Sequence, residues 1–232
     1  MFADLSGKVA LVTGGGQGLG LGIVLKMAEQ GADIAIADLS DKNAASAASL
    51  VEALGRKAYT ARMDVTDADS VSAGVASITS AAGQIDILVN NAGTSAAGPF
   101  ESVTDEGWQT DLDLKLFGAI RFCRLAIPHM REQGGGRIIN VTNLGGRTPG
   151  PSSMPTSISR AAGIALTKGL SKDLAKDNIL VTTVCIGLVK SGQHQRRYEA
   201  RLEKEPNLTI ETFYDELAHG RNPVPLGRVA EP

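Results

Sequence analysis

The stretch that decides the fold is VALVTGGGQGLGLG, residues 9–22. Its first part is an apolar, β-rich run that ends at Thr13, and a glycine-rich turn then leads directly into a segment of helical composition. The absent side chains of Gly14, Gly18 and Gly20 allow a tight turn and let a phosphate group approach the backbone N–H groups at the start of the helix. The stretch therefore predicts a strand, a phosphate-binding turn and a helix in succession.

Similar apolar runs recur along the chain, and segments of helical composition separate them. They cover residues 33–38, 57–62, 86–90, 137–142 and 179–186. This alternation predicts a doubly wound parallel sheet with helices on both faces, a three-layer α/β/α arrangement, because strands buried on both sides are apolar throughout. We expect one domain over residues 1–232. The polar segment at about 190–223 follows the last run, where a lid over a ligand crevice would lie.

Composition narrows the possible partners and location. The 232 residues carry a formal net charge of −2, which gives no electrostatic reason to expect nucleic acid or an anionic membrane as a partner. The two cysteines lie in apolar runs without metal-ligand spacing, so we expect neither a disulfide framework nor a metal site. No secretory leader pattern and no membrane-spanning apolar run are evident, and the expected location is cytoplasmic.

A second feature supports the reading of the glycine turn. The glycines alone would also suit an ordinary tight turn, but the run 33–38 ends in Asp38. A carboxylate at the end of the second strand can accept hydrogen bonds from the adenosine ribose hydroxyls, and it repels a 2′-phosphate. The sequence therefore predicts a dinucleotide site that prefers NAD(H) over NADP(H).

Two motifs in register resemble those of the short-chain dehydrogenase/reductase family. They are Thr13-Gly-x-x-x-Gly-x-Gly20 and the NNAG of residues 90–93. The resemblance covers nearly the whole chain and implies a Rossmann-type sheet, hydride transfer between nicotinamide and a small alcohol or carbonyl compound, and a homodimer or homotetramer through helices around 105–132 and 155–176. The cofactor residues that it implies are Gly14, Gln17, Gly18, Leu19, Gly20, Asp38, Asp64, Val65, Asn91, Ala92, Gly93, Arg160 and Val189.

The proton chemistry of that family uses an Asn, a Ser, a Tyr and a Lys. In register with the resemblance, these positions hold Lys115, Asn143, Thr156 and Arg160, and the last two keep the i, i+4 spacing that places them on one helix face. An aliphatic hydroxyl is a far weaker acid than a phenol, and a guanidinium stays protonated. The family mechanism therefore cannot run unchanged on these residues.

Other groups at the site leave alternatives open. Arg160 can bind the nicotinamide ribose and Asn143 a carbonyl oxygen, whereas Lys115 brings a second cation towards the crevice. That cation predicts either an anionic ligand or a lowered Lys115 pKa that makes the ammonium an acid; a surface ion pair with a carboxylate such as Asp113 is the alternative. His194 is a further candidate proton donor, unless its segment is simply a solvated amphipathic helix.

Three functions remain open from the sequence. The first is an oxidoreductase with a non-standard active site, whose proton comes from Lys115, a lid residue or water. The second is a catalytically silent nucleotide-binding homologue that serves as a sensor or scaffold. The third is non-redox chemistry, such as that of a lyase, which would exploit the cations of Lys115 and Arg160.

Overall fold

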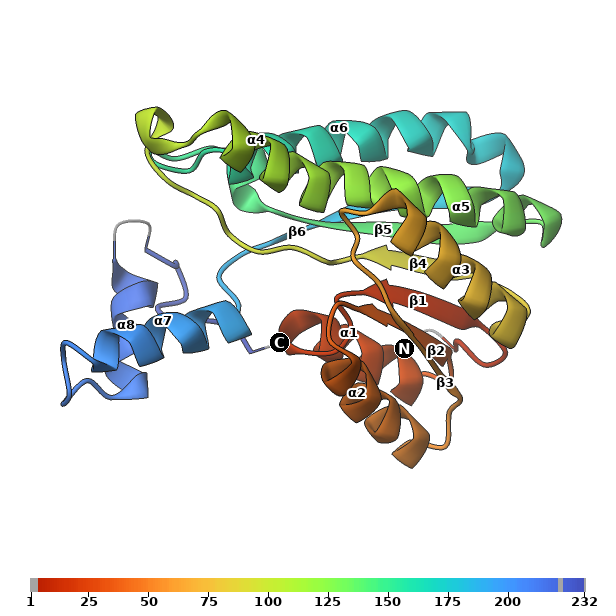
Figure 1. Ribbon diagram of the computed structural model, residues 1–232, viewed down its shortest axis with the longest axis horizontal. Coiled ribbons are helices and arrows are strands. Elements are labelled where there is room, and N and C mark those ends of the chain that lie inside the picture. Colours follow the sequence, from red (N-terminus) through yellow and green to blue (C-terminus); the bar gives the residue numbers. More distant parts are fainter. Residues whose placement is uncertain (1–3, 221–222, 232) are drawn as a thin grey trace.

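The computed structural model describes residues 4–220 and 223–231, whose six strands form one parallel sheet in the order β3-β2-β1-β4-β5-β6 (Figure 1). The strands are β1 (Val9–Thr13), β2 (Asp33–Asp38), β3 (Ala58–Arg62), β4 (Ile87–Asn90), β5 (Gly136–Asn143) and β6 (Ile179–Ile186). Each lies within about one residue of an apolar run in the sequence. The doubly wound parallel sheet is thus confirmed.

Helices cover both faces of this sheet (Figure 1). On one face lie α1 (Gly18–Glu29) and α2 (Asp41–Ala53), and on the other lie α3 (Ala68–Ala82), α5 (Gly118–Glu132) and α6 (Thr156–Asp173). Every residue of β1 is buried, because alternate side chains enter the two separate cores. Leu11 belongs to the core under α3 and α5, whereas Val12 belongs to the core under α1 and α2.

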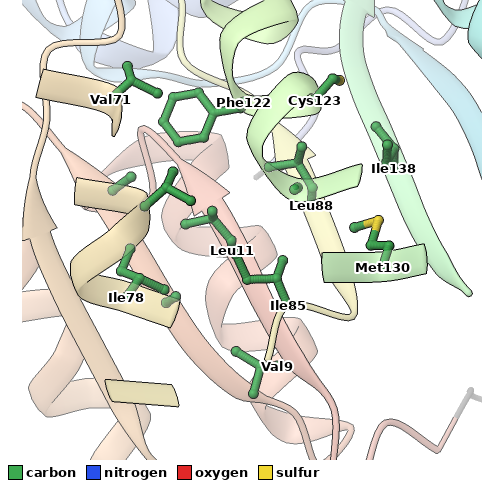
Figure 2. Packing of buried hydrophobic residues seen from close by; sticks show 14 of the residues in the cluster. Val9, Leu11, Val71, Ile78, Ile85, Leu88, Phe122, Cys123, Met130 and Ile138 are labelled. Atoms are coloured by element: carbon green, nitrogen blue, oxygen red, sulfur yellow. The ribbon is translucent and has the colours of Figure 1, made fainter. Parts of the chain in front are cut away.

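The core between the sheet and α3 and α5 is the larger of the two. Figure 2 shows Leu11, Leu88 and Ile138 from three strands together with Phe122 and Met130 from α5. All five side chains are almost completely buried. This packing fixes α5 against β4 and β5 and thereby positions the segment that precedes α5.

The order of the strands places a crevice next to β1. From β1 the chain proceeds outwards through β2 and β3, and then returns to the other side of β1 to form β4, β5 and β6. Connections that diverge from neighbouring strands leave an opening beyond their carboxyl ends, where ligands bind in sheets of this type. The glycine turn after β1 and residues 91–95 after β4 border this opening.

Two segments there have local structure that the sequence did not reveal. The predicted helix around 105–132 is interrupted: α4 (Asp105–Leu112) and α5 are joined by a π-helical turn, Asp113–Phe117. The proposed lid segment contains α7 (Gly192–Leu202) and α8 (Ile210–His219), which lie beyond the carboxyl ends of the strands (Figure 1). Within the described residues, no helix has the length and apolar character needed to cross a bilayer.

Candidate cofactor cleft and active site

The turn after β1 is shaped for close approach of a ligand to the backbone. Gly14 and Gly18 have φ angles of +63° and +54°, a region that residues with side chains rarely adopt. A Cβ atom at Gly20 would lie 1.9 Å from the carbonyl oxygen of Gly14, so any side chain there would force the turn apart. The N-terminal N–H groups of α1 therefore stay accessible to an anion, and the turn fits a nicotinamide dinucleotide.

Asp38 is held in place at the end of β2. Its Oδ2 accepts a hydrogen bond from the Gly16 N–H at 3.0 Å, and its Oδ1 accepts one from the Ser40 N–H at 3.0 Å. A carboxylate has about four lone-pair sites, so both oxygens can accept further bonds from the hydroxyls of a ribose. The structure thus supplies an oriented acceptor where the sequence predicted one.

Thr13 and Asn91 brace the glycine turn against the end of β4. The Thr13 Oγ1 accepts hydrogen bonds from the N–H groups of Asn91 and Ala92, both at 3.0 Å. The Asn91 Nδ2 donates to the carbonyl oxygens of Thr13 at 3.0 Å and of Gly14 at 3.2 Å. These bonds fix the two loops that face each other across the crevice.

The crevice is a cleft of about 550 Å³. All thirteen residues that the family resemblance implies for the cofactor line it, and so do Asn143, Thr156 and His194. Lys115 is absent from this lining and instead borders a smaller cavity of about 10 Å³ with Arg160 and Asn90. Lys115 was expected to approach the crevice together with Arg160; it borders the smaller cavity beside Arg160, and its side chain does not line the main cleft.

Lys115 belongs to a buried ion pair. Its side chain is 0% exposed, and its Nζ contacts the Oδ1 of Asp111, whose side chain is 1% exposed. Burial is the main cause that lowers the pKa of Lys115 to about 8; Asp111 opposes this effect, and the Arg160 charge adds to it. Proton transfer from this ammonium is thus possible near neutral pH.

The partner of Lys115 is not the one that the sequence suggested. Asp113 instead pairs with Arg121 at 3.3 Å near the surface. Asp111 precedes Lys115 by four residues, a helical spacing that could have indicated the pair, whereas side chains two residues apart, such as those of Asp113 and Lys115, do not face each other on a helix. Ser159, a second residue missed by sequence reasoning, donates from Oγ to the Asp111 Oδ2 at 2.6 Å.

Thr156 stands between Lys115 and the cleft. Its Oγ1 accepts hydrogen bonds from the Lys115 Nζ at 3.0 Å and from the Ala96 N–H at 3.0 Å. The same hydroxyl donates a hydrogen bond to the Asp111 Oδ1 at 3.4 Å. Because Thr156 lines the cleft and Lys115 does not, the hydroxyl is the atom through which the buried ammonium can reach a ligand.

Arg160 lies one helical turn beyond Thr156 and borders both cavities. Its Nη1 donates to the Val141 carbonyl oxygen at 2.8 Å, whereas its buried Nε has no hydrogen-bond partner among the described residues. Burial lowers its pKa. A Cβ at Gly93 would lie 2.7 Å from the Arg160 Nη2, so this glycine leaves the room that the guanidinium occupies.

Asn143 and His194 complete the predicted set. The Asn143 Oδ1 accepts a hydrogen bond from the Gly146 N–H at 3.2 Å, an arrangement that leaves its amide N–H groups as donors. His194 is 8% exposed, packs edge-on against Tyr214 of α8 and has no partner for its Nδ1 in the described chain. Burial first, and then the Arg197 charge, lower the His194 pKa, so the imidazole is mainly neutral at neutral pH.

Comparison with known proteins assigns the family. Residues 8–202 match the family model described as short chain dehydrogenase. The chain is also 31% identical over 228 residues to 3-oxoacyl-[acyl-carrier-protein] reductase FabG of Thermotoga maritima, and the match covers 98% of this chain and 87% of the relative. The protein therefore belongs to the short-chain dehydrogenase/reductase family.

Solved structures agree with this assignment. L-sorbose reductase of Gluconobacter frateurii, complexed with NADPH and L-sorbose, superimposes with a TM-score of 0.93 at 31% identity, over 99% of this chain and 88% of that one. A short-chain oxidoreductase of Pseudomonas aeruginosa PAO1 described as containing an atypical catalytic center gives 0.90 at 34% identity, over 99% and 87%. Other solved relatives hold NAD, so members of this family bind either nicotinamide dinucleotide.

Proposed function

We propose that this protein is an NAD(H)-dependent oxidoreductase for a small alcohol or carbonyl substrate, with Lys115, Asn143, Thr156 and Arg160 at the reacting end of the cleft. The observation that carries the proposal is the 3.0 Å contact between the Lys115 Nζ and the Thr156 Oγ1, because it connects a buried acid to the cleft wall. The bound dinucleotide supplies or accepts the hydride. The likeness to the Pseudomonas oxidoreductase with an atypical catalytic center supports a working site that departs from the family pattern.

In this mechanism Thr156 passes on a proton that comes from Lys115. When a carbonyl substrate is reduced, the Thr156 hydroxyl donates its proton to the developing alkoxide and accepts another from the Lys115 ammonium. A threonine hydroxyl is too weak an acid to do this alone, but the pKa of about 8 at Lys115 suits a general acid near neutral pH. Asp111 holds the ammonium in place, and Ser159 holds Asp111.

Two other side chains orient the reactants. The free amide N–H groups of Asn143 donate to the substrate oxygen, which polarises the carbonyl group. The Arg160 guanidinium, fixed by its bond to Val141, donates to the nicotinamide ribose. Together they place the substrate carbon and the nicotinamide at the same end of the cleft.

The proposed cofactor preference is for NAD(H) over NADP(H). The oriented Asp38 carboxylate supports it, since it can accept bonds from both adenosine ribose hydroxyls and would lie against a 2′-phosphate of like charge. The NADPH complex of L-sorbose reductase shows that a related protein uses the other dinucleotide. The affinities for NADH and NADPH therefore need direct comparison.

The proposed oligomer uses the outer surfaces of the π-helical turn and α6. Phe117 and Ile158 on these segments are 41% and 42% exposed, although both are large and apolar. Apolar side chains that form a contiguous patch are typical of surfaces that associate. We expect a homodimer or homotetramer through these helices, which light scattering of the wild-type protein and of a Phe117→Ser, Ile158→Ser variant would test.

Cofactor titration followed by a turnover screen tests the function. Calorimetric titration with NADH and NADPH comes first, and we expect selective binding of NADH. Initial rates of NADH oxidation are then measured with a panel of small ketones, aldehydes and keto sugars that includes L-sorbose. Binding without turnover on any substrate would favour the silent homologue, activity that persists without nicotinamide would favour the lyase, and a failure to bind either nucleotide would refute the proposal altogether.

A further inference from the structure

The first turn of α7 lies directly against the glycine turn after β1. A Cβ atom at Gly18 would lie 3.8 Å from the backbone nitrogen of Gly192, and a Cβ at Gly192 would lie 3.4 Å from the Gln17 Oε1. The helix is anchored there by Gln193, whose Oε1 accepts a hydrogen bond from the Ser95 N–H at 2.9 Å. The N-termini of α1 and α7 therefore meet at one wall of the cofactor cleft.

The first turns of α1 and α7 carry no acidic side chain of their own. They share this with α5 and α6, whereas α2, α3, α4 and α8 each have at least one acidic residue there. The partial positive charges of the two helix N-termini thus add in the same part of the cleft, next to the Asp38 carboxylate that Gly16 and Ser40 hold. An anionic group of a ligand would be stabilised between them.

Arg196 adds a full positive charge at this place. Its Nη1 lies 3.6 Å from the position that a Gly192 Cβ would take, beside the side chain of Gln17, and Arg196 lines the cleft. In the described chain no carboxylate pairs with it, whereas Arg201 on the same helix pairs with Glu205 and Glu216. An unpaired guanidinium at an anion site can bind phosphate oxygens in bidentate fashion.

Neighbouring residues hold this face of α7 towards the cleft. His194 is buried, and its ring packs on Tyr214 with centroids 6.1 Å apart, which ties α7 to α8. Arg197 also lines the cleft, but its charge acts on the His194 imidazole as well and contributes to the lowered pKa of that ring. Arg196 is the arginine beside Gln17, next to the glycine turn.

We propose that Arg196 binds the pyrophosphate of the dinucleotide, so that α7 forms the second wall of the phosphate site opposite the glycine turn. This inference rests on the proposed function, since it assumes that the cleft binds a nicotinamide dinucleotide. It goes beyond that function by assigning to the lid segment a share of cofactor affinity that the glycine turn alone would otherwise supply. The lid then closes on the cofactor as well as on the substrate.

Calorimetry with ADP-ribose, which carries the pyrophosphate but no nicotinamide, tests the assignment. We expect Arg196→Gln to weaken the affinity for ADP-ribose about 10-fold, because one charge-assisted contact to phosphate is lost at a partly solvated site. Arg196→Lys should lose less affinity for ADP-ribose, because lysine keeps the positive charge but lacks the paired N–H donors of the guanidinium. Lys204→Gln, which removes an equal charge just beyond α7 and outside the cleft, should bind as the wild type does.

Further measurements separate the possible outcomes. The affinity of the wild-type protein should fall more steeply with added salt than that of Arg196→Gln, and adenosine, followed by ligand NMR, should bind both equally. Unchanged ADP-ribose affinity in Arg196→Gln would overturn the inference while leaving the proposed function intact. A loss confined to NADPH would also overturn it, because Arg196 would then contact the 2′-phosphate. If the wild-type protein bound no dinucleotide or ADP-ribose, both the function and this inference would fail.

Discussion

Replacement of Asp111 by Asn probes the buried pair beneath the cleft. The amide keeps the shape of the carboxylate and an oxygen for Ser159, but it removes the charge that opposes the desolvation of Lys115. A hydrogen bond to a charged group contributes about 1.5 to 3 kcal/mol, and 1.36 kcal/mol corresponds to one pKa unit. The substitution should therefore lower the Lys115 pKa by about one to two, from about 8 to about 6 or 7.

The pH profile of turnover reports this change. Carbonyl reduction needs protonated Lys115, so in the wild type kcat should fall as the pH rises through about 8, and in Asp111→Asn it should fall through about 6 or 7. Alcohol oxidation needs the neutral amine, so its profile should show the opposite slope with the same midpoints. Initial rates in both directions, taken at saturating cofactor and substrate, measure these midpoints.

Asp113→Asn is the matched control. This carboxylate lies two residues away, pairs with Arg121 near the surface and contacts neither Lys115 nor Thr156. Its midpoint should match that of the wild type, and NADH affinity should be unchanged in both variants because neither position lines the cleft. If the midpoint of Asp111→Asn stayed at that of the wild type, or moved to higher pH, Lys115 could not be the acid in the mechanism proposed.

Three further substitutions test other parts of the site. Thr156→Val keeps the volume but removes the hydroxyl, so kcat should fall about 10²- to 10⁴-fold. The calorimetric NADH affinity should stay within about twofold of the wild type. A small effect on kcat would rule out a proton relay through this oxygen. Gly20→Ala places a methyl group 1.9 Å from the Gly14 carbonyl oxygen and should weaken the affinity for NADH at least about 100-fold. Circular dichroism checks that the variant is folded. A near-normal affinity would contradict the geometry of the proposed phosphate site. Asp38→Ser removes the charge that opposes a 2′-phosphate and should raise the NADPH-to-NADH affinity ratio about 10-fold or more in paired titrations. An unchanged ratio would show that Asp38 does not determine the cofactor preference.

The fold could be predicted from the sequence because its signals are local. A strand buried on both sides must be apolar at successive positions, as in β1, and the glycine turn has conformational needs that are set within a few residues. The same holds for Asp38 at the end of β2. These features are set by residues that are close in the sequence, so they do not depend on how the helices pack.

The register of the candidate site was likewise accessible, since it follows from motifs along the chain. Thr156 and Arg160 were placed on one helix face by their spacing, and both line the cleft in the structure. The sequence did not indicate the π-helical turn at Asp113–Phe117, because the residues of this turn do not distinguish it from an α-helix. The spacing along the chain nevertheless favoured Asp111 over Asp113 as the partner of Lys115, because Asp111 lies four residues before it and Asp113 only two.

The sequence by itself determined the layers of this protein, the glycine turn after β1 and the alignment that assigns Lys115, Asn143, Thr156 and Arg160 to the proposed site. Only the tertiary structure decided what those residues can do. Thr156 meets Lys115 across 41 positions of the chain, and Ser159 meets Asp111 across 48. The pKa of Lys115 depends on how completely these contacts exclude water, a property of packing among α4, the π-helical turn and α6 that no local pattern encodes.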